Sequence, residues 1–197
     1  MMNIELEKIE QRVAGEVTRA YESVDVPHYA YHNLTHTRAV VGHCRELAAH
    51  YSLGNRGTFV LVVAAWFHDI GHLYGEIEGH EQRGVVRMKD CLSDLPAELI
   101  GQIAACILAT KVPSHPGSLS EKIICDADTF HFGTPEFRRT DALVHQEVEL
   151  RKGIVITDWP ARTLTVLRRH VFFTDYCQML LTKGKEENIA WVEARLR

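Results

Sequence analysis

The chain has 197 residues, of which 46% are hydrophobic and 24% charged, and these values are typical of a globular domain with a substantial core. A formal net charge of -4 argues against a nucleic-acid scaffold protein, which would usually carry a basic face. No apolar stretch approaches the roughly 18 residues of a membrane-spanning helix, so no membrane association is expected.

The cysteines and the amino-terminal segment favour a cytoplasmic protein. The five cysteines are scattered and form no Cys-x-x-Cys pair, which favours reduced core residues and argues against a thiolate zinc site. They are Cys44, Cys91, Cys106, Cys125 and Cys177. The first residues, "MMNIELEKIEQRV", are charged from the fifth position onward and lack the apolar core of a signal peptide.

The first third of the chain is predicted to be mostly helical. Apolar residues recur at intervals of mostly three to four from Ile4 to Tyr21, which predicts an amphipathic helix. A loop is expected over Val24–Tyr31, which contains a proline, and a second helix from about Leu34 to Tyr51. The glycines of Gly54–Gly57 predict a turn.

An almost wholly apolar segment, Thr58–His68, follows this turn. Its valines also suit a strand, but its length and its Ala64-Ala65 pair favour a helix at the centre of the core. Gly71, Gly75 and Gly79 come next, and each glycine disfavours a helix by about 1 kcal/mol relative to alanine. We therefore expect a flexible loop after the apolar helix.

The remaining elements are also predicted to be helical, so the fold class is all-α with one compact helical bundle. Helix signals follow one another to the end of the chain, with no hairpin and no repeat. The expected helices are His80–Cys91, a Ser93-capped helix reaching Ala109, Leu119–Phe132, a helix from the Thr134-Pro135-Glu136 cap to Lys152, a long helix from Asp158 to about Leu181, and a short helix in the tail "KGKEENIAWVEARLR".

The residues that point to chemistry begin with His68 and Asp69, which end the apolar run in "WFHDIGH". Adjacent residues on a helix point about 100° apart, so both could reach one ion only near a helix end. A second pair, His32 and His36, lies one helical turn apart in "YAYHNLTHTRAV". Aspartates interrupt another apolar run in "KIICDADTFHFG". Such a set of nitrogen and oxygen ligands suits Mn, Fe, Co, Ni, Mg or Zn in an octahedral site better than a closed structural zinc site.

The order His…His-Asp…Asp resembles the HD superfamily of metal-dependent phosphohydrolases. The resemblance spans about Tyr31–Phe137 and rests on four segments in the same order, "YHNLTH", "FHDIGH", "HEQRGV" and "ICDADTFHFG". It implies one HD domain over residues 1–197, with a core at about 31–137 and flanking helices at both ends. It also implies four metal ligands, His36, His68, Asp69 and Asp128. Asp128 is preferred to Asp126 because a polar and an apolar residue follow it, as is usual in the family.

The resemblance also implies roles for residues beyond this ligand set. His32, from the opening segment, is expected to protonate the leaving group, with His80 as the other candidate, while Asp69 steers the proton of the attacking water. Some HD proteins hold a second metal with a histidine like His80 and another at the end of the next helix. Here that helix ends at Lys111, which disfavours a second metal and suits substrate phosphate. His72 is a second candidate substrate-binding residue.

The expected function is hydrolysis of a phosphate ester or anhydride of a small molecule, foremost a nucleotide, with one divalent metal ion as cofactor. Two alternatives remain open: a nucleotide-binding signalling module without turnover, and a di-iron HD-type oxygenase. The expected partners are the phosphorylated substrate and, in a homodimer, a second copy of the chain. His43, His50, His145 and His170 lie on expected helix faces without identifiable partners and are interpreted as structural.

Overall fold

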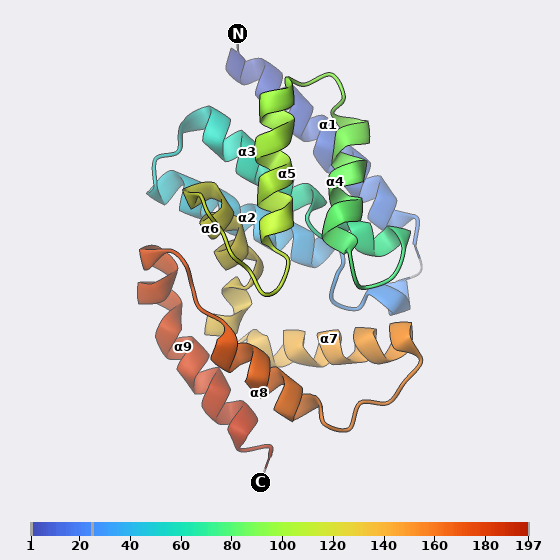
Figure 1. Cartoon of the computed structure of the whole chain (residues 1–197), viewed down its shortest axis with the longest axis vertical. Helices are drawn as coiled ribbons and strands as arrows, with labels where there is room; N and C mark the ends of the chain where they lie inside the picture. Colours follow the sequence, from blue (N-terminus) through green and yellow to red (C-terminus); the bar gives the residue numbers. More distant parts are fainter. Residues whose placement is uncertain (1, 25, 197) are drawn as a thin grey trace. The chain divides into compact units, whose positions relative to one another are not determined.

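The computed structural model describes residues 2–24 and 26–196, which contain helices and no strand, so the all-α prediction is confirmed (Figure 1). Contacts divide the chain into two compact units, which comprise residues 2–24 with 32–127 and residues 26–31 with 128–196. No helix of the described ranges is both long and apolar enough to cross a membrane.

The first unit is organised around one buried helix. Its elements are α1 (Met2–Glu22), α2 (Leu34–His50), α3 (Gly54–Phe67), the 3-10 helix η2 (Ile70–Tyr74), α4 (His80–Cys91), α5 (Ala97–Ala109) and α6 (Leu119–Asp128), whose last residue begins the second unit. Every residue from Phe59 to Phe67 is buried, and α1, α2, α4 and α5 all pack against α3. The predicted apolar helix therefore lies at the centre of this core, as its composition requires.

The start of α3 differs from the prediction. Gly54–Gly57 forms the first turn of the helix rather than a separate turn, and Thr58 Oγ1 donates to the Gly54 carbonyl at 2.9 Å. The chain reverses earlier, at Ser52, whose φ is 54°. Leu53 then donates its backbone N–H to Ala48, which completes the end of α2.

The segment expected to be a flexible loop is held by one arginine, and this corrects the prediction. Arg83 of α4 donates to the backbone carbonyls of Gly71 at 2.9 Å and Glu78 at 3.1 Å, and also to that of Glu76. The same segment contains the 3-10 helix η2. A partly exposed guanidinium that donates to three carbonyls supplies the order that the glycine content argues against.

Two glycines serve close packing rather than flexibility. A Cβ atom on Gly71 would lie 1.9 Å from the His80 carbonyl oxygen, and one on Gly84 would lie 2.6 Å from the Phe67 carbonyl oxygen. Both distances are far below van der Waals contact, so only glycine allows η2 and the end of α3 to approach α4 this closely. This approach brings His80 next to the end of α3.

The second unit contains η1 (Val26–Tyr29), η3 (Phe130–Gly133), α7 (Phe137–Lys152), α8 (Trp159–Arg169) and α9 (Asp175–Glu193). Its core includes four buried side chains, Phe137, Leu164, Leu167 and Val192. The short helix η1 lies within the predicted loop Val24–Tyr31. Asp25 of that loop and Arg197 of the predicted tail helix lie outside the described residues.

The predicted long helix from Asp158 to Leu181 is wrong, because two helices occupy this region. α8 ends at Arg169, where the next residue, His170, is extended with a ψ of 141°. Thr174 then caps α9 and accepts from the Cys177 backbone N–H at 3.3 Å. Such a cap offers the backbone an alternative to a continued helix, and α9 then includes most of the predicted tail helix.

The cysteines lie where the sequence predicts core thiols. None of the five, all of them described residues, forms a disulfide, and four are buried while Cys91 is partly exposed. Burial, with a contribution from Glu121, raises the pKa of the Cys106 thiol to about 12. A thiol with so high a pKa is a poor nucleophile and a poor metal ligand at neutral pH.

Candidate metal centre

His68 and Asp69 stand at the end of α3, where the chain turns into η2. His68 is the residue that follows the helix, and Asp69 precedes the first residue of η2. They are 0% and 4% exposed. Their side chains meet, with His68 Nε2 3.1 Å from Asp69 Oδ2. The helix end thus allows two neighbouring residues to face one point.

His36 reaches the same point from the first turn of α2. Asn33 caps this helix, because its side-chain oxygen accepts from the backbone N–H groups of Thr35 at 2.8 Å and His36 at 3.2 Å. His36 Nε2 lies 3.3 Å from Asp69 Oδ2 and 3.4 Å from His68 Nε2. The cap therefore determines where the helix starts and so which way His36 projects.

The tautomer of His68 follows from its backbone contact. Its Nδ1 lies 2.7 Å from the Ala65 carbonyl oxygen, which can only accept, so Nδ1 carries the hydrogen. In the neutral ring the Nε2 lone pair then faces Asp69 Oδ2. Burial acts to raise the pKa of Asp69, but the imidazoles of His68 and His32 hold it well below its usual range. The carboxylate is thus available as an anionic ligand.

The three distances fit a divalent ion. Metal–ligand bonds of about 2.1 Å place neighbouring ligand atoms about 3.0 Å apart in an octahedron and about 3.4 Å apart in a tetrahedron. The separations among His36 Nε2, His68 Nε2 and Asp69 Oδ2 are 3.1, 3.3 and 3.4 Å. Asp69 Oδ2 is also buried without a well-aligned hydrogen-bond donor among the described residues. These atoms are spaced for a shared cation more than for bonds to one another.

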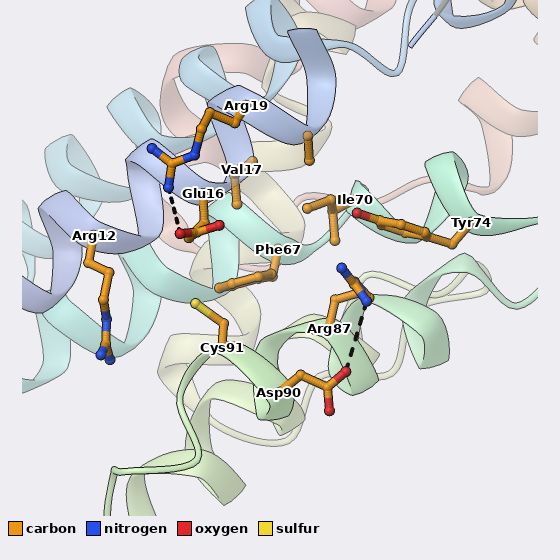
Figure 2. A pocket seen from close by; sticks show the side chains of 11 residues that line it. Arg12, Glu16, Val17, Arg19, Phe67, Ile70, Tyr74, Arg87, Asp90 and Cys91 are labelled. Carbon is orange, nitrogen blue, oxygen red and sulfur yellow. Dashed lines mark hydrogen bonds and ion pairs between the residues drawn. The ribbon is translucent and has the colours of Figure 1, made fainter. Parts of the chain in front are cut away.

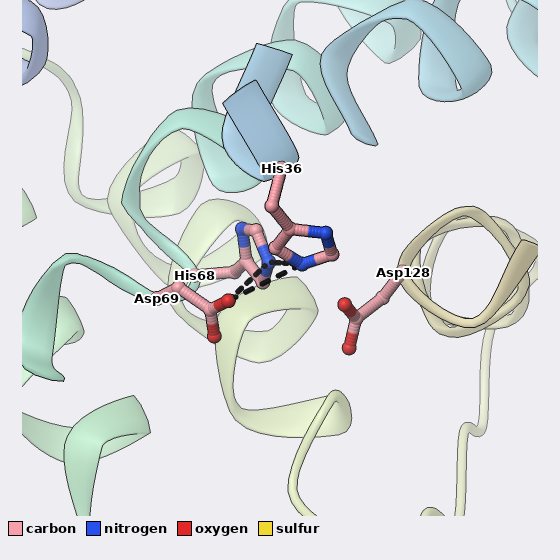
Figure 3. Close-up of side chains that lie close together, drawn as sticks. All are labelled: His36, His68, Asp69 and Asp128. Carbon is pink, nitrogen blue, oxygen red and sulfur yellow. Dashed lines mark hydrogen bonds and ion pairs between the residues drawn. The ribbon is translucent and has the colours of Figure 1, made fainter. Parts of the chain in front are cut away.

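Asp128 is the fourth predicted ligand, at the last residue of α6. Figure 3 shows the side chains of His36, His68 and Asp69, all of the first unit, pointing toward one another. Asp128 belongs to the second unit, and its role as the fourth ligand stays a prediction. Asp126, two residues earlier on the same helix, is fully buried.

A second group of ligand-type side chains shares Asp69. His80 Nε2 lies 3.5 Å from Asp69 Oδ1, and His72 Nε2 lies 3.9 Å from the same oxygen. These atoms lie within 4.8 Å of one another. The Nδ1 of His80 lies 2.9 Å from the Ile77 carbonyl oxygen and donates to it, so Nε2 presents its lone pair to Asp69. Each oxygen of Asp69 thus faces its own set of imidazoles.

The rings of His32, His72 and His80 form a stack. The ring centroids of His32 and His72 are 4.0 Å apart, and those of His72 and His80 are 3.9 Å apart. His72 is 1% exposed, whereas the His80 side chain is 19% exposed. His32 and His80, the predicted proton donors, therefore lie on the two sides of one buried ring.

Lys111 follows α5 in the chain and is exposed. Its backbone N–H donates to the Leu108 carbonyl at 3.3 Å. Its predicted contact with substrate phosphate stays a prediction.

Sequence reasoning missed three residues that shape the site. Asn33 caps α2, and Arg83 holds the segment between η2 and α4. The third is Glu81, a buried carboxylate next to His80. An asparagine directly before a predicted helix is a cap signal, and Glu81 belongs to the quoted "HEQRGV" segment. The contacts of Arg83 have no such local signal.

A concave region lies between α1 and α4, with Phe67 and Ile70 among its lining residues (Figure 2). Its volume is about 470 Å³. Among its lining residues, Arg19 pairs with Glu16 at 2.5 Å and Arg87 with Asp90 at 4.0 Å, while Arg12 pairs with Asp94 outside the lining. None of the metal-type groups of the described residues lies there, so the cluster around Asp69 is the better candidate for chemistry.

Comparison with known proteins agrees with this arrangement. The HD domain family model matches residues 33–133, which is just over half of the chain. The matched segment contains all four predicted metal ligands. No curated protein and no solved structure matches the chain.

Proposed function

The chain belongs to the HD domain family, and we propose that it is a phosphohydrolase acting on a phosphate ester or anhydride of a small molecule, foremost a nucleotide. Members of this family are mostly metal-dependent phosphohydrolases. The observation that carries the proposal is the convergence of His36 Nε2, His68 Nε2 and Asp69 Oδ2 at separations of 3.1–3.4 Å. We propose these three residues and Asp128 as the ligands of one divalent ion, chosen among Mn, Fe, Co, Ni, Mg and Zn.

The residues of the site have separate tasks in this proposal. A divalent ion held by these residues would supply Lewis-acid chemistry, making a water more acidic and polarising a phosphoryl oxygen. The backbone carbonyl of Ala65 orients His68, and the cap at Asn33 orients His36. Asp69, at 4% exposure, keeps a carboxylate in surroundings that exclude bulk water and steers the proton of the attacking water.

Proton transfer to the leaving group falls to His32 or His80. His80 is partly exposed, and its Nδ1 is engaged with the Ile77 carbonyl, so its Nε2 is the atom that would exchange a proton. His32 stacks on His72 and lies within the same column of rings. Lys111 remains the proposed contact for the substrate phosphate, where an ammonium offsets charge that develops on the phosphoryl oxygens.

A second cation is favoured by the group formed by Asp69, His72 and His80. The lone pair of His80 Nε2 and Asp69 Oδ1 face each other across 3.5 Å, which is unfavourable unless a proton or a cation lies between them. The burial of His72 suits a ligand better than the substrate contact first expected for it. If both groups are filled, His32 is left as the proton donor. A pair of redox-active metals would also permit the oxygenase alternative.

The test is turnover by metal-free protein to which Mn, Co, Ni, Mg, Fe or Zn is added. The substrates are cyclic nucleotides, mononucleotides, nucleoside triphosphates and the generic diester bis(4-nitrophenyl) phosphate. We expect metal-dependent hydrolysis, followed by phosphate release and, for diesters, by nitrophenol release. Oxygen uptake without hydrolysis would support the di-iron oxygenase. Tight nucleotide binding without either activity would support the signalling module.

A further inference from the structure

Glu81 is a buried carboxylate that the proposed chemistry has not yet used. It follows His80 in the first turn of α4 and is 5% exposed. Its Oε1 lies 3.7 Å from His80 Nε2, the atom that also faces Asp69 Oδ1 at 3.5 Å. Its Oε2 is buried and has no hydrogen-bond partner among the described residues.

A buried carboxylate without a donor destabilises the fold. Folding removes its hydration, and the loss is recovered only when donors or a cation replace the water. Glu147, in the second unit, is a buried carboxylate whose lost hydration is replaced by hydrogen-bond donors. It is 1% exposed, its Oε2 accepts from the Tyr31 backbone N–H at 2.9 Å, and its Oε1 accepts from Arg151 at 3.4 Å. Within residues 2–24 and 26–196, Glu81 has no comparable donors, so its place in the core calls for another explanation.

We infer that Glu81 is a positioning residue of the Asp69 site, and this inference rests on the proposed cation site. Its carboxylate accepts hydrogen bonds from water on the side of the site formed by Asp69 and His80. Its Oε1 lies beside His80 Nε2, so the negative charge of the Glu81 carboxylate faces the side of the site formed by Asp69 and His80. Carboxylates that hold the outer ligands of a metal strengthen its binding and orient what is bound.

The experiment compares two buried glutamates by substitution with methionine, which fills a similar volume without charge. Glu81→Met and Glu147→Met are each measured by urea unfolding of metal-free protein and by calorimetric titration with Mn²⁺. Glu81→Gln keeps the shape and one acceptor oxygen. Glu78→Gln, in the preceding segment, is the control for a lost charge nearby. Turnover of bis(4-nitrophenyl) phosphate is measured for the same variants.

We expect Glu81→Met to leave the unfolding midpoint of metal-free protein unchanged or higher, because it removes a buried charge without a donor. Mn²⁺ affinity should fall about 10- to 100-fold, with Glu81→Gln between this variant and the wild type. Glu147→Met should instead lower the unfolding midpoint, because it leaves the Tyr31 backbone N–H and the Arg151 guanidinium without their acceptor oxygens. Glu78→Gln should behave as the wild type.

The inference is overturned if Glu81→Met lowers the metal-free midpoint as Glu147→Met does and binds Mn²⁺ like the wild type. That result would make Glu81 a structural residue. A wild type that binds Mn²⁺ but hydrolyses none of the substrates contradicts the proposed function alone, because the affinity of the Glu81 variants still decides their role. A wild type that binds no Mn²⁺ overturns both.

Discussion

In the first unit, His36, His68 and His80 direct their Nε2 atoms at one buried carboxylate, whereas the histidines of the second unit have separate partners. His145 Nε2 lies 3.1 Å from Glu149 and its ring stacks on a tryptophan. His170 Nε2 lies 3.0 Å from Thr129 Oγ1. The comparison shows that residue type alone does not make a ligand. Convergence of several lone pairs on one point distinguishes a candidate site from structural histidines.

The strongest test of this comparison removes one member of the convergent group. His68→Ala or Asp69→Ala should abolish metal binding and turnover while the helical content is kept, because each removes a ligand at the shared point. His145→Gln, which changes a histidine with its own partner, should keep both. Elemental analysis and far-ultraviolet circular dichroism measure the outcome. Unchanged metal content in both first-unit variants would contradict the site.

The two aspartates of α6 sharpen the comparison within one helix. Asp128→Ala should lose metal, and Asp126→Ala should keep most of it, because Asp128 is the aspartate that matches the closing segment of the family. Metal content after dialysis decides between them. The reverse result would move the fourth ligand two residues upstream, and equal loss would show that the two carboxylates act as one hydrogen-bonded unit.

Lys111 tests whether an exposed lysine serves the reaction. Lys111→Ala should retain the metal and lose roughly 10- to 1000-fold in turnover, about 1.4–4 kcal/mol. The substitution removes the ammonium that is proposed to contact the transferring phosphoryl group. Lys111→Arg should recover part of the rate, since a planar guanidinium does not reproduce a compact ammonium. Lys89→Ala, at another exposed lysine, is the control. Full turnover in Lys111→Ala would show that Lys111 is an exposed residue without a role in the reaction.

His170 offers the smallest effect and concerns stability. Burial, aided by Lys185, lowers the pKa of His170 from 6.5 to about 4. Because the folded pKa lies below the unfolded value, its contribution to stability is present above pH 6.5 and is lost as pH falls toward 4. The difference corresponds to at most about 3 kcal/mol. His170→Gln should therefore show a smaller drop in urea midpoint between pH 7 and about pH 4.5 than the wild type. An equal drop in both proteins would contradict this assignment.

Much of the fold could be predicted because its signals are local. The apolar run before His68 has the composition of a core helix, and α3 is buried throughout. The break between α8 and α9 was missed, because Thr174 is an inconspicuous cap between two helix-forming stretches. The segment around Gly71 was predicted to be a flexible loop, and its order was missed as well. The hydrogen bond that restrains it comes from Arg83, twelve residues away.

The sequence by itself determined the helical class and the kinds of ligand, because periodicity, caps and the His-Asp pair are patterns of neighbouring residues. Only the tertiary structure decided which atoms meet. His36 and His68 are 32 positions apart, and their Nε2 atoms come within 3.4 Å because α2 packs on α3. Likewise, His80 faces Asp69 because Gly71 lets η2 approach α4 without a side chain between them. Such convergence depends on packing between segments, which no local pattern encodes.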